Sequence, residues 1–518
     1  MRTLKLKALL GSFLLVLSLS TAVAQAPQAQ SAAGTDRELL EVMHSIGSQP
    51  LYDYLKELVS EKFGGRLTGT PEYNLSAEWV SSLLKKWNLV PAGDKGTYLQ
   101  AFPNPYTLVF KGCGLYLHLP VGGGTSKGEI VKHYLYEDEF IPGGTSGSGE
   151  VTAEVVYAGY GISAPELGYD DYRGVDVKGK IVLIEREVPV DPGKNTEVFK
   201  QWRPYSFHQY KLINAADHGA KGLIYNYGPI VNPNNAYRAG FIYSHVGDAV
   251  VADMFAGTGR GHDEVVARIA KTLKPQSFAT GKVVTIKNVT EHHPQGVGFN
   301  VLGLVPGADP VLKDEVIIIG GHLDHLGRNW ELMPGANDNA AAVSVMLGLA
   351  EAMSKYSVKP KRSVLFCFFG AEEQAVHGSE FYAEHPVFPL SKTMAMINME
   401  AVGAGDKFHV LAGMDFPGLY KFLEQANQRY IHKVITGSPF SNIARPRQDV
   451  TWFLWKGVPG VTLSAYGGPE SPLPTYHNTR DNLSLIAPET LEDTARLLFL
   501  AVEDMASAGK LDFRAKGN

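Results

Sequence analysis

Residues 316–325 read VIIIGGHLDH, an apolar run of β-branched side chains that ends in two glycines and then in polar residues. Such a run predicts a short strand that is buried on both faces of a sheet. Three more runs of this kind alternate with two amphipathic stretches of helical periodicity: residues 340–353, 364–369, 394–397, 461–464 and 488–505. The alternation predicts an α/β fold in which helices cover both faces of a mostly parallel mixed sheet.

Side chains that can bind metal follow these predicted strands. Asp338 lies in the sequence GANDN at residues 335–339, just before the first predicted helix. The other polar positions directly follow the four runs or lie close behind them: His322, Asp324, Glu372, Glu373, Glu400, Tyr476 and His477. Because the carboxyl ends of parallel strands meet at one edge of a sheet, we expect these side chains to gather there.

The residue types indicate zinc. Imidazole nitrogens and carboxylate oxygens are ligands that zinc accepts, and a catalytic site keeps one position open for water. Two histidines and three carboxylates exceed one tetrahedral site, whereas two metal ions that share one carboxylate would use all of them. Each residue by itself has an ordinary interpretation as a core histidine or a solvated carboxylate, but their common position after strands favours a metal site.

Four segments, followed by Asp481, carry a resemblance to a known family: GHLD at 321–324, GANDN at 335–339, FGAEE at 369–373 and YH at 476–477. In these segments the chain resembles the co-catalytic dizinc exopeptidases, which include secreted bacterial leucine-type aminopeptidases, glutamate carboxypeptidase and the transferrin receptor. The likeness extends to GGRLTGT at residues 64–70. The resemblance implies a zinc exopeptidase fold of the phosphorylase/hydrolase-like type.

A second resemblance lies inside the chain. The sequences AGYG at residues 158–161 and DVKGKIV at 176–182, with residues 214–220, look like a protease-associated domain, a small β-rich module. The two resemblances imply an order of parts along the chain: a signal peptide at 1–24, the N-terminal part of the peptidase domain at 25–130, the protease-associated insert at 131–280 and the catalytic peptidase domain at 281–510.

The family resemblance implies two Zn²⁺ ions per chain and assigns their ligands residue by residue. His322 and Glu400 would hold one ion, Glu373 and His477 would hold the other, and Asp338 would bridge both. The resemblance also implies that the peptide bond following Asp338 is cis.

Three further residues have roles that the resemblance implies. Glu372 would be the general base, a role that suits a carboxylate beside a metal-activated water. Asp324 would accept the second imidazole proton of His322 and fix its tautomer. Tyr476 would donate a hydrogen bond to the developing oxyanion.

The implied function is that of a zinc-dependent exopeptidase, specifically an aminopeptidase that removes N-terminal residues from peptides. One position departs from the family: Glu400 stands where the aminopeptidase members have aspartate, and a longer side chain there is typical of related metallo-carboxypeptidases. A carboxypeptidase or dipeptidase of the same dizinc type therefore stays open, as does a glutaminyl cyclase-like enzyme with one zinc. A receptor ectodomain with a decayed site is disfavoured, because none of the five ligand positions is lost.

The N-terminus predicts export. Positive side chains at positions 2, 5 and 7 precede an apolar stretch at residues 8–20, which is too short to span a membrane, and a small-x-small cleavage site ends at Ala24. A cleaved signal peptide predicts a secreted or periplasmic protein with no stable membrane anchor. With 19% charged residues and no run of like charges, the chain is not expected to bind nucleic acid, and its expected partner is a peptide substrate. The sequence predicts no oligomeric state.

Several other residues were weighed as functional candidates. Cys113 and Cys367 lie in strand-like stretches and are expected to be buried thiols, without a disulfide. His325 and His377 are expected to be loop or supporting histidines, because the metal ligands are already supplied. Arg447 could bind a substrate carboxylate or form a surface salt bridge, and the salt bridge is favoured.

Overall fold

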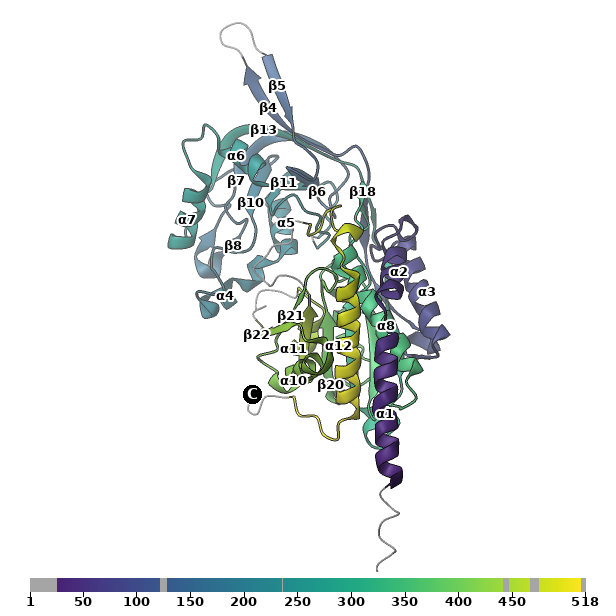
Figure 1. Cartoon of the computed structure of the whole chain (residues 1–518). Helices are drawn as coiled ribbons and strands as arrows, with labels where there is room; N and C mark the ends of the chain where they lie inside the picture. Colours follow the sequence, from purple (N-terminus) through teal and green to yellow (C-terminus); the bar gives the residue numbers. More distant parts are fainter. Residues whose placement is uncertain (1–25, 122–127, 235, 441–446, 466–474, 514–518) are drawn as a thin grey trace, which may run out of the picture.

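The computed structural model describes residues 26–121, 128–234, 236–440, 447–465 and 475–513. The predicted signal peptide at residues 1–24 lies outside these ranges. Within them, no helix combines the length and the apolar character that crossing a bilayer requires. Two sheets, each with its own helices, make up most of the described chain (Figure 1).

The larger sheet has nine strands in the order β1-β15-β19-β16-β20-β23-β21-β22, with β2 beside β15. Its four central strands are parallel: β16 (Val316–His322), β19 (Ser363–Phe369), β20 (Thr393–Met399) and β23 (Gly460–Ser464). Antiparallel pairing begins on both sides of this centre, where the outer strands are β1 (Val90–Pro91), β2 (Leu99–Pro103), β15 (Val297–Val305), β21 (Lys407–Leu411) and β22 (Val434–Ser438). The predicted mixed α/β sheet with a parallel centre is confirmed.

The central strands are buried on both faces, as their continuous apolar sequences predict. In β16, Ile317 and Ile319 pack into one apolar cluster, while Val316 and Ile318 pack into a second cluster on the opposite face. Cys367 of β19 belongs to this second cluster and is a free, buried thiol. Cys113 is also free and buried, so the prediction for both cysteines is confirmed.

Helices cover both faces of the larger sheet. The first cluster is completed by α1 (Ala26–Ser45), α2 (Ser48–Leu58), α3 (Pro71–Lys86), α8 (Ala341–Lys355), α10 (Pro417–Ala426) and α12 (Pro488–Ser507). The second is completed by α9 (His377–Glu384) and α11 (Val450–Trp455). The turn-rich segment at residues 64–70 joins α2 to α3, and the Thr70 side chain caps α3 by accepting a hydrogen bond from Tyr73 N at 3.2 Å.

The smaller sheet has eight strands in the order β5-β4-β13-β7-β10-β11-β12-β6. The strands are β4 (Gly114–Val121), β5 (Gly128–His133), β6 (Phe140–Pro142), β7 (Gly149–Tyr157), β10 (Ile181–Glu185), β11 (Gly222–Asn226), β12 (Ile242–Val246) and β13 (Phe278–Asn288). Its helices are α4 (Thr196–Trp202), α5 (His208–Asp217), α6 (Asp248–Phe255) and α7 (His262–Thr272), and a short pair, β8 (Ser163–Ala164) and β9 (Tyr169–Asp170), lies beside them. Figure 1 shows this unit at one end of the molecule, with the β4–β5 hairpin projecting from it.

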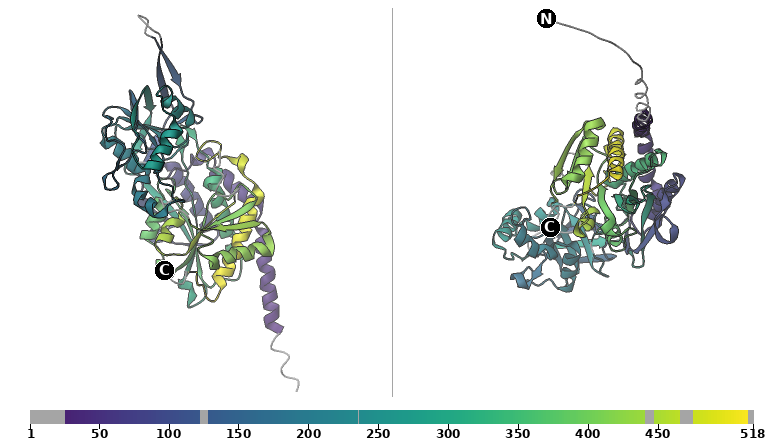
Figure 2. Two further views of the ribbon diagram at one scale, coloured as in Figure 1. Left: turned by 90° about the vertical axis from the view of Figure 1, so that its left-hand side faces the viewer. Right: turned by 90° about the horizontal axis from the view of Figure 1, so that it is seen from below.

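The two units contact each other through a small sheet and a small apolar cluster. The sheet contains β3 (Tyr106–Val109), β14 (Thr290–His293), β17 (Arg328–Asn329) and β18 (Glu331–Leu332). The apolar cluster joins Ile141 and Val231 from the smaller unit to Leu326 and Met333 from the larger one. Two further views show the units side by side, with α1 extending away from both (Figure 2).

Candidate metal centre

The structure brings together the side chains that the sequence pattern indicated. They follow the carboxyl ends of the four parallel strands, or lie in the segments between these strands and the next helix: His322, Asp324, Asp338, Glu372, Glu373, Glu400, Tyr476 and His477.

Asp338 lies between two histidines. Its Oδ1 is 3.2 Å from His322 Nε2, and its Oδ2 is 3.4 Å from His477 Nε2. His322 Nε2 is also 3.2 Å from Glu400 Oε1, and His477 Nε2 is 3.0 Å from Glu373 Oε2. Two pairs, each made of one imidazole and one glutamate, therefore share the Asp338 carboxylate.

The second ring nitrogen of each histidine faces a main-chain carbonyl. His322 Nδ1 is 3.0 Å from Asp324 O, and His477 Nδ1 is 2.8 Å from Val231 O. Since a carbonyl oxygen only accepts, Nδ1 carries the proton, and a neutral ring presents the lone pair of Nε2 to the carboxylates. Burial disfavours a charged His322, but the carboxylates of Glu400, Asp324 and Asp338 together outweigh burial and raise the pKa of His322 well above its usual value. The site therefore favours a positive charge between the imidazoles and the carboxylates.

The donor set fits metal ions. Among the described residues, Asp338 Oδ1 and Glu400 Oε2 are buried and accept no hydrogen bond. Two groups have ligand atoms that all lie within 4.8 Å of one another: His322, Asp338 and Glu400, and His325, Asp338 and Glu373. Nitrogen and oxygen donors in this number suit zinc, and cations between the carboxylates would offset their buried negative charge.

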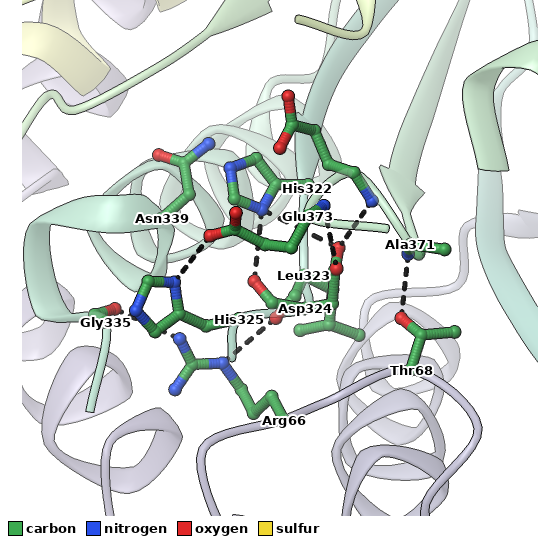
Figure 3. A network of polar contacts seen from close by, with 12 residues as sticks. Arg66, Thr68, His322, Leu323, Asp324, His325, Gly335, Asn339, Ala371 and Glu373 are labelled. Atoms are coloured by element: carbon green, nitrogen blue, oxygen red, sulfur yellow. Dashed lines mark hydrogen bonds and ion pairs between the residues drawn. The ribbon is translucent and has the colours of Figure 1, made fainter. Parts of the chain in front are cut away.

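His325, which was expected to be a loop or supporting histidine, contacts the carboxylate of Glu373. Its Nδ1 is 2.8 Å from Glu373 Oε1, and its ring is fully buried, edge-on to the ring of His477 at 5.9 Å between centroids. Figure 3 shows His325 pointing at the Glu373 carboxylate. The sequence had a signal for this, because His325 follows the same strand as His322, three residues later.

Asp324 fixes the turn that carries the two adjacent glutamates. Its Oδ1 accepts a hydrogen bond from Glu372 N at 3.2 Å, and its Oδ2 accepts one from Glu373 N at 3.3 Å. The expected contact with His322 is different in detail: the Asp324 carboxylate is 3.6 Å from Nδ1, too far for a hydrogen bond, and the main-chain carbonyl of Asp324 accepts instead. Burial raises the pKa of Glu372 well above its usual value, which suits a group that accepts a proton during catalysis.

A buried arginine supports the loops beneath the site (Figure 3). Arg66 is fully buried, and its guanidinium donates to four main-chain carbonyls at 2.7 to 3.0 Å: those of Leu58, Leu323, Pro334 and Gly335. Nearby, Thr68 Oγ1 accepts a hydrogen bond from Ala371 N at 2.7 Å. The sequence analysis included residues 64–70 in the resemblance but assigned them no role.

The peptide bond between Asp338 and Asn339 is cis, as predicted. Asn339 is anchored by its side chain, which donates to Met399 O at 2.9 Å and accepts from Ala401 N at 3.2 Å. The Asp481 carboxylate accepts hydrogen bonds from Asp338 N at 3.0 Å and from the preceding N–H at 2.8 Å. The segment is thus held from two sides.

A pocket of about 80 Å³ opens beside Glu372 and Glu373. Tyr476 lines it with 44% of its surface exposed and stacks on His477 at 3.6 Å between ring centroids. Arg447 also lines it and makes the favoured salt bridge, with Nη2 2.8 Å from Glu187 Oε1. The smaller unit supplies four lining residues that the sequence analysis did not single out: His208, Tyr227, Asn232 and Asn234.

Two regions of the chain match known families. Residues 300–502 match Peptidase family M28, and residues 151–250 match the PA domain. Aminopeptidase YwaD of Bacillus subtilis is 24% identical over 495 residues, which cover 94% of this chain and 90% of that protein. A vacuolar membrane protease of Candida tropicalis is 25% identical over 232 residues, which cover 43% of this chain. The matched part spans only 24% of the length of this protease.

The fold agrees with that of a solved relative. The zinc aminopeptidase from Bacillus subtilis superposes with a TM-score of 0.58 at 19% sequence identity, over 90% of this chain and 99% of that chain. The zinc exopeptidase fold and the inserted protease-associated domain, which the sequence resemblance implied, are confirmed.

Proposed function

Because the chain belongs to peptidase family M28 through residues 300–502 and carries a PA domain at residues 151–250, we propose that it is a zinc-dependent aminopeptidase acting on peptides. The observation that carries the proposal is the position of Asp338, whose two carboxylate oxygens face different histidine–glutamate pairs. A carboxylate shared in this way is what two neighbouring metal ions require. The aminopeptidases among its relatives favour cleavage from the N-terminus.

We assign one Zn²⁺ to His322 and Glu400 and a second to Glu373 and His477, with Asp338 between them. The distances among their nitrogen and oxygen atoms support this division. Bound zinc would acidify a coordinated water and polarise the scissile carbonyl. The Nδ1 hydrogen bonds of the two histidines keep their Nε2 atoms directed at the carboxylates.

Four neighbouring residues complete the proposed mechanism. Glu372 takes the proton of the attacking water and delivers it to the leaving amine. Asp324 keeps Glu372 in place through the N–H groups of the turn. Tyr476 donates a hydrogen bond from its hydroxyl group to the oxyanion that develops on the carbonyl. His325 holds the Glu373 carboxylate, which leaves metal binding on that side to His477.

The proposal also includes the export of the protein and the boundaries of its domains. We propose that the signal peptide is cleaved after about Ala24 and that the mature enzyme is secreted or periplasmic. The insert at residues 131–280 stays a prediction. Strand β4 pairs with β13 and β5 in the smaller sheet, which favours an earlier start of the insert than residue 131.

The test compares substrates with free and blocked N-termini. The full-length protein is expected to hydrolyse aminoacyl 4-nitroanilides and to leave N-blocked dipeptides intact. Elemental analysis should find two zinc ions per chain, and their removal by a chelator should abolish turnover until zinc is restored.

Other outcomes would assign a different activity. Hydrolysis confined to the N-blocked dipeptides would identify a carboxypeptidase or dipeptidase, the direction that Glu400 left open. One zinc per chain, together with cyclisation of N-terminal glutamine, would identify a glutaminyl cyclase. A protein that stays fully active after rigorous chelation would exclude the metal mechanism altogether.

A further inference from the structure

The loop that carries His477 is bonded to the inserted unit. Val231, which follows β11 in that unit, makes two reciprocal hydrogen bonds with His477. Its carbonyl accepts from the imidazole Nδ1 at 2.8 Å, and its N–H donates to His477 O at 3.0 Å. Both the ring and the main chain of His477 are therefore oriented by a residue outside the peptidase unit.

A second contact fixes the same loop two residues further on. The Glu137 carboxylate, in the turn between β5 and β6, accepts hydrogen bonds from Thr479 N at 2.5 Å and from Thr479 Oγ1 at 2.8 Å. Hydrogen bonds to a charged acceptor are the stronger ones, so this pair of bonds is a firm anchor. The inserted unit thus holds the loop on both sides of residue 478.

Apolar packing supports these polar contacts. Val231 is 2% exposed and packs with Ile141, Leu326 and Met333, which join the two units next to the metal centre. Leu326 follows His325 directly in the chain, so the insert also packs against the loop behind the Glu373 side of the site.

The other half of the centre has no such dependence. His322 Nδ1 donates to Asp324 O, which lies two residues along the same loop of the peptidase unit. The two ligand histidines therefore make equivalent hydrogen bonds, but only His477 relies on the insert for its acceptor. Removing a hydrogen-bond partner behind a metal ligand lowers metal affinity by roughly 10- to 100-fold.

We propose that the PA insert is the positioning element for His477, and that its contacts set the affinity of the zinc ion held by Glu373 and His477 but not that of the ion held by His322 and Glu400. This inference rests on the proposed function, because it assumes two ions at the ligands named above. The insert is then a working part of the metal centre, in addition to lining the pocket.

The test removes an anchor that touches neither metal nor substrate. In the full-length protein, Glu137→Ala deletes both acceptors for Thr479, and one of the two zinc ions is expected to bind about 10-fold more weakly. Competition with a chromogenic zinc chelator measures the two affinities. Cobalt substitution gives a second readout, because the absorption of one cobalt site should be lost at lower chelator concentration than that of the other.

Two variants serve as controls. Glu137→Gln is expected to keep both zinc affinities at the wild-type value. Its amide oxygen can accept from Thr479 N, and its amide NH₂ can donate to Thr479 Oγ1. Glu187→Ala is the matched substitution: Glu187 also lies in the insert, has a similar left-handed backbone (φ 57° against 68° for Glu137) and bonds to the peptidase unit, but at Arg447. It is expected to leave both zinc affinities at the wild-type value.

The inference is overturned if Glu137→Ala weakens both ions equally or neither, or if Glu187→Ala has the same effect. If Glu137→Ala fails to fold, Val231→Ala tests the other anchor by removing the packed side chain that holds the Val231 carbonyl in place behind His477, with the same selective loss expected. In a His477→Ala background, Glu137→Ala should cause no further loss. A wild-type chain with fewer than two zinc ions would contradict the proposed function, whereas two ions lost without selectivity would contradict only this inference.

Discussion

Glu372 is the residue on which turnover should depend most. Glu372→Gln keeps the shape of the side chain but cannot take a proton, so kcat is expected to fall by about 10² to 10⁴-fold. Zinc content should stay at two per chain, because Glu372 belongs to neither group of metal-binding atoms. Steady-state kinetics and elemental analysis on one preparation measure both. Glu384→Gln, at an exposed position of α9, is the control, and a fully active Glu372→Gln enzyme would show that the base is another group.

Glu503 gives the protein a pH-dependent stability unrelated to the metal centre. Burial, followed by the Asp504 carboxylate, raises the pKa of Glu503 to about 8, whereas the unfolded chain has a pKa near 4.3. Between these values the folded state binds a proton that the unfolded state does not, so stability is lost as pH rises from about 4.5 to about 8. Glu503→Gln should therefore be close to the wild type in stability at pH 5 and exceed it by about 4 kcal/mol at pH 9.

Urea unfolding at the two pH values measures this difference. Glu41→Gln on α1, whose carboxylate is 62% exposed, is the control and should change stability equally at both. The assignment would be contradicted if the difference in stability between Glu503→Gln and the wild type were the same at pH 9 as at pH 5.

Candidate metal ligands are easier to find in the sequence than the residues that support them. His322 and Glu373 combine a suitable donor with a position just after a strand, and both properties are local in the chain. The role of Arg66 is not local, since its guanidinium reaches a carbonyl 257 residues away. The contact of His325 is not local either, because its partner Glu373 comes within reach only when two strands pair.

At the scale of elements, α9 positions the turn that carries the adjacent glutamates Glu372 and Glu373. Gly378, the second residue of α9, donates its N–H to Gly370 O at 3.0 Å, and a Cβ there would lie 2.1 Å from the same oxygen. Alanine favours helix over glycine by up to about 1 kcal/mol, but this overlap with the backbone dominates. Gly378→Ala is therefore expected to destabilise the protein by about 2 to 3 kcal/mol and to lower kcat by displacing the turn.

The comparison is with Gly418→Ala, because Gly418 is likewise the second residue of its helix, α10. A Cβ at Gly418 would meet its nearest atom at 3.4 Å, an ordinary contact, so this variant should be as stable as the wild type or slightly more so. Chemical denaturation measures both variants. Equal stabilities of the two would mean that the Gly370–Gly378 contact relaxes without cost.

Strands with one continuous apolar run could be predicted, and strands with mixed surfaces could not. Strands β16 and β19 are buried along their whole length, so their sequences are unambiguous. Strand β22 is half-exposed and contains glycine, and β5 is exposed at nearly every position, so neither has a pattern that separates it from a loop. Strand β22, which the sequence did not predict, extends the larger sheet beyond its parallel centre, and α10, which was also not predicted, packs on one face of this sheet.

At the scale of the whole molecule, the sequence resemblance predicted an insert but not its contacts. The reciprocal bonds between Val231 and His477 join residues 246 positions apart, and no local pattern marks either as a partner of the other. The expected boundary at residue 131 also falls inside the β4–β5 hairpin. The boundary was placed where the amino-acid composition changes along the chain, but the pairing of β4 with β5 is visible only in the folded sheet.

If the contacts of the insert strengthen zinc binding, bound zinc must in turn stabilise those contacts. Metal removal should therefore loosen the insert where it contacts the His477 loop. Hydrogen exchange in the full-length protein is expected to speed up by about 10-fold on chelation at residues 135–142, 226–234 and 475–482. Helix α7 contributes no residue to the pocket beside Glu372 and Glu373 or to the cluster joining the units, so its exchange should not change. Mass spectrometry with and without a chelator, followed by zinc addition to reverse the effect, measures this. Unchanged exchange at residues 226–234 would show that the insert and the metal centre are energetically independent despite their contacts. Faster exchange throughout the insert would contradict a coupling confined to the segments that contact the His477 loop.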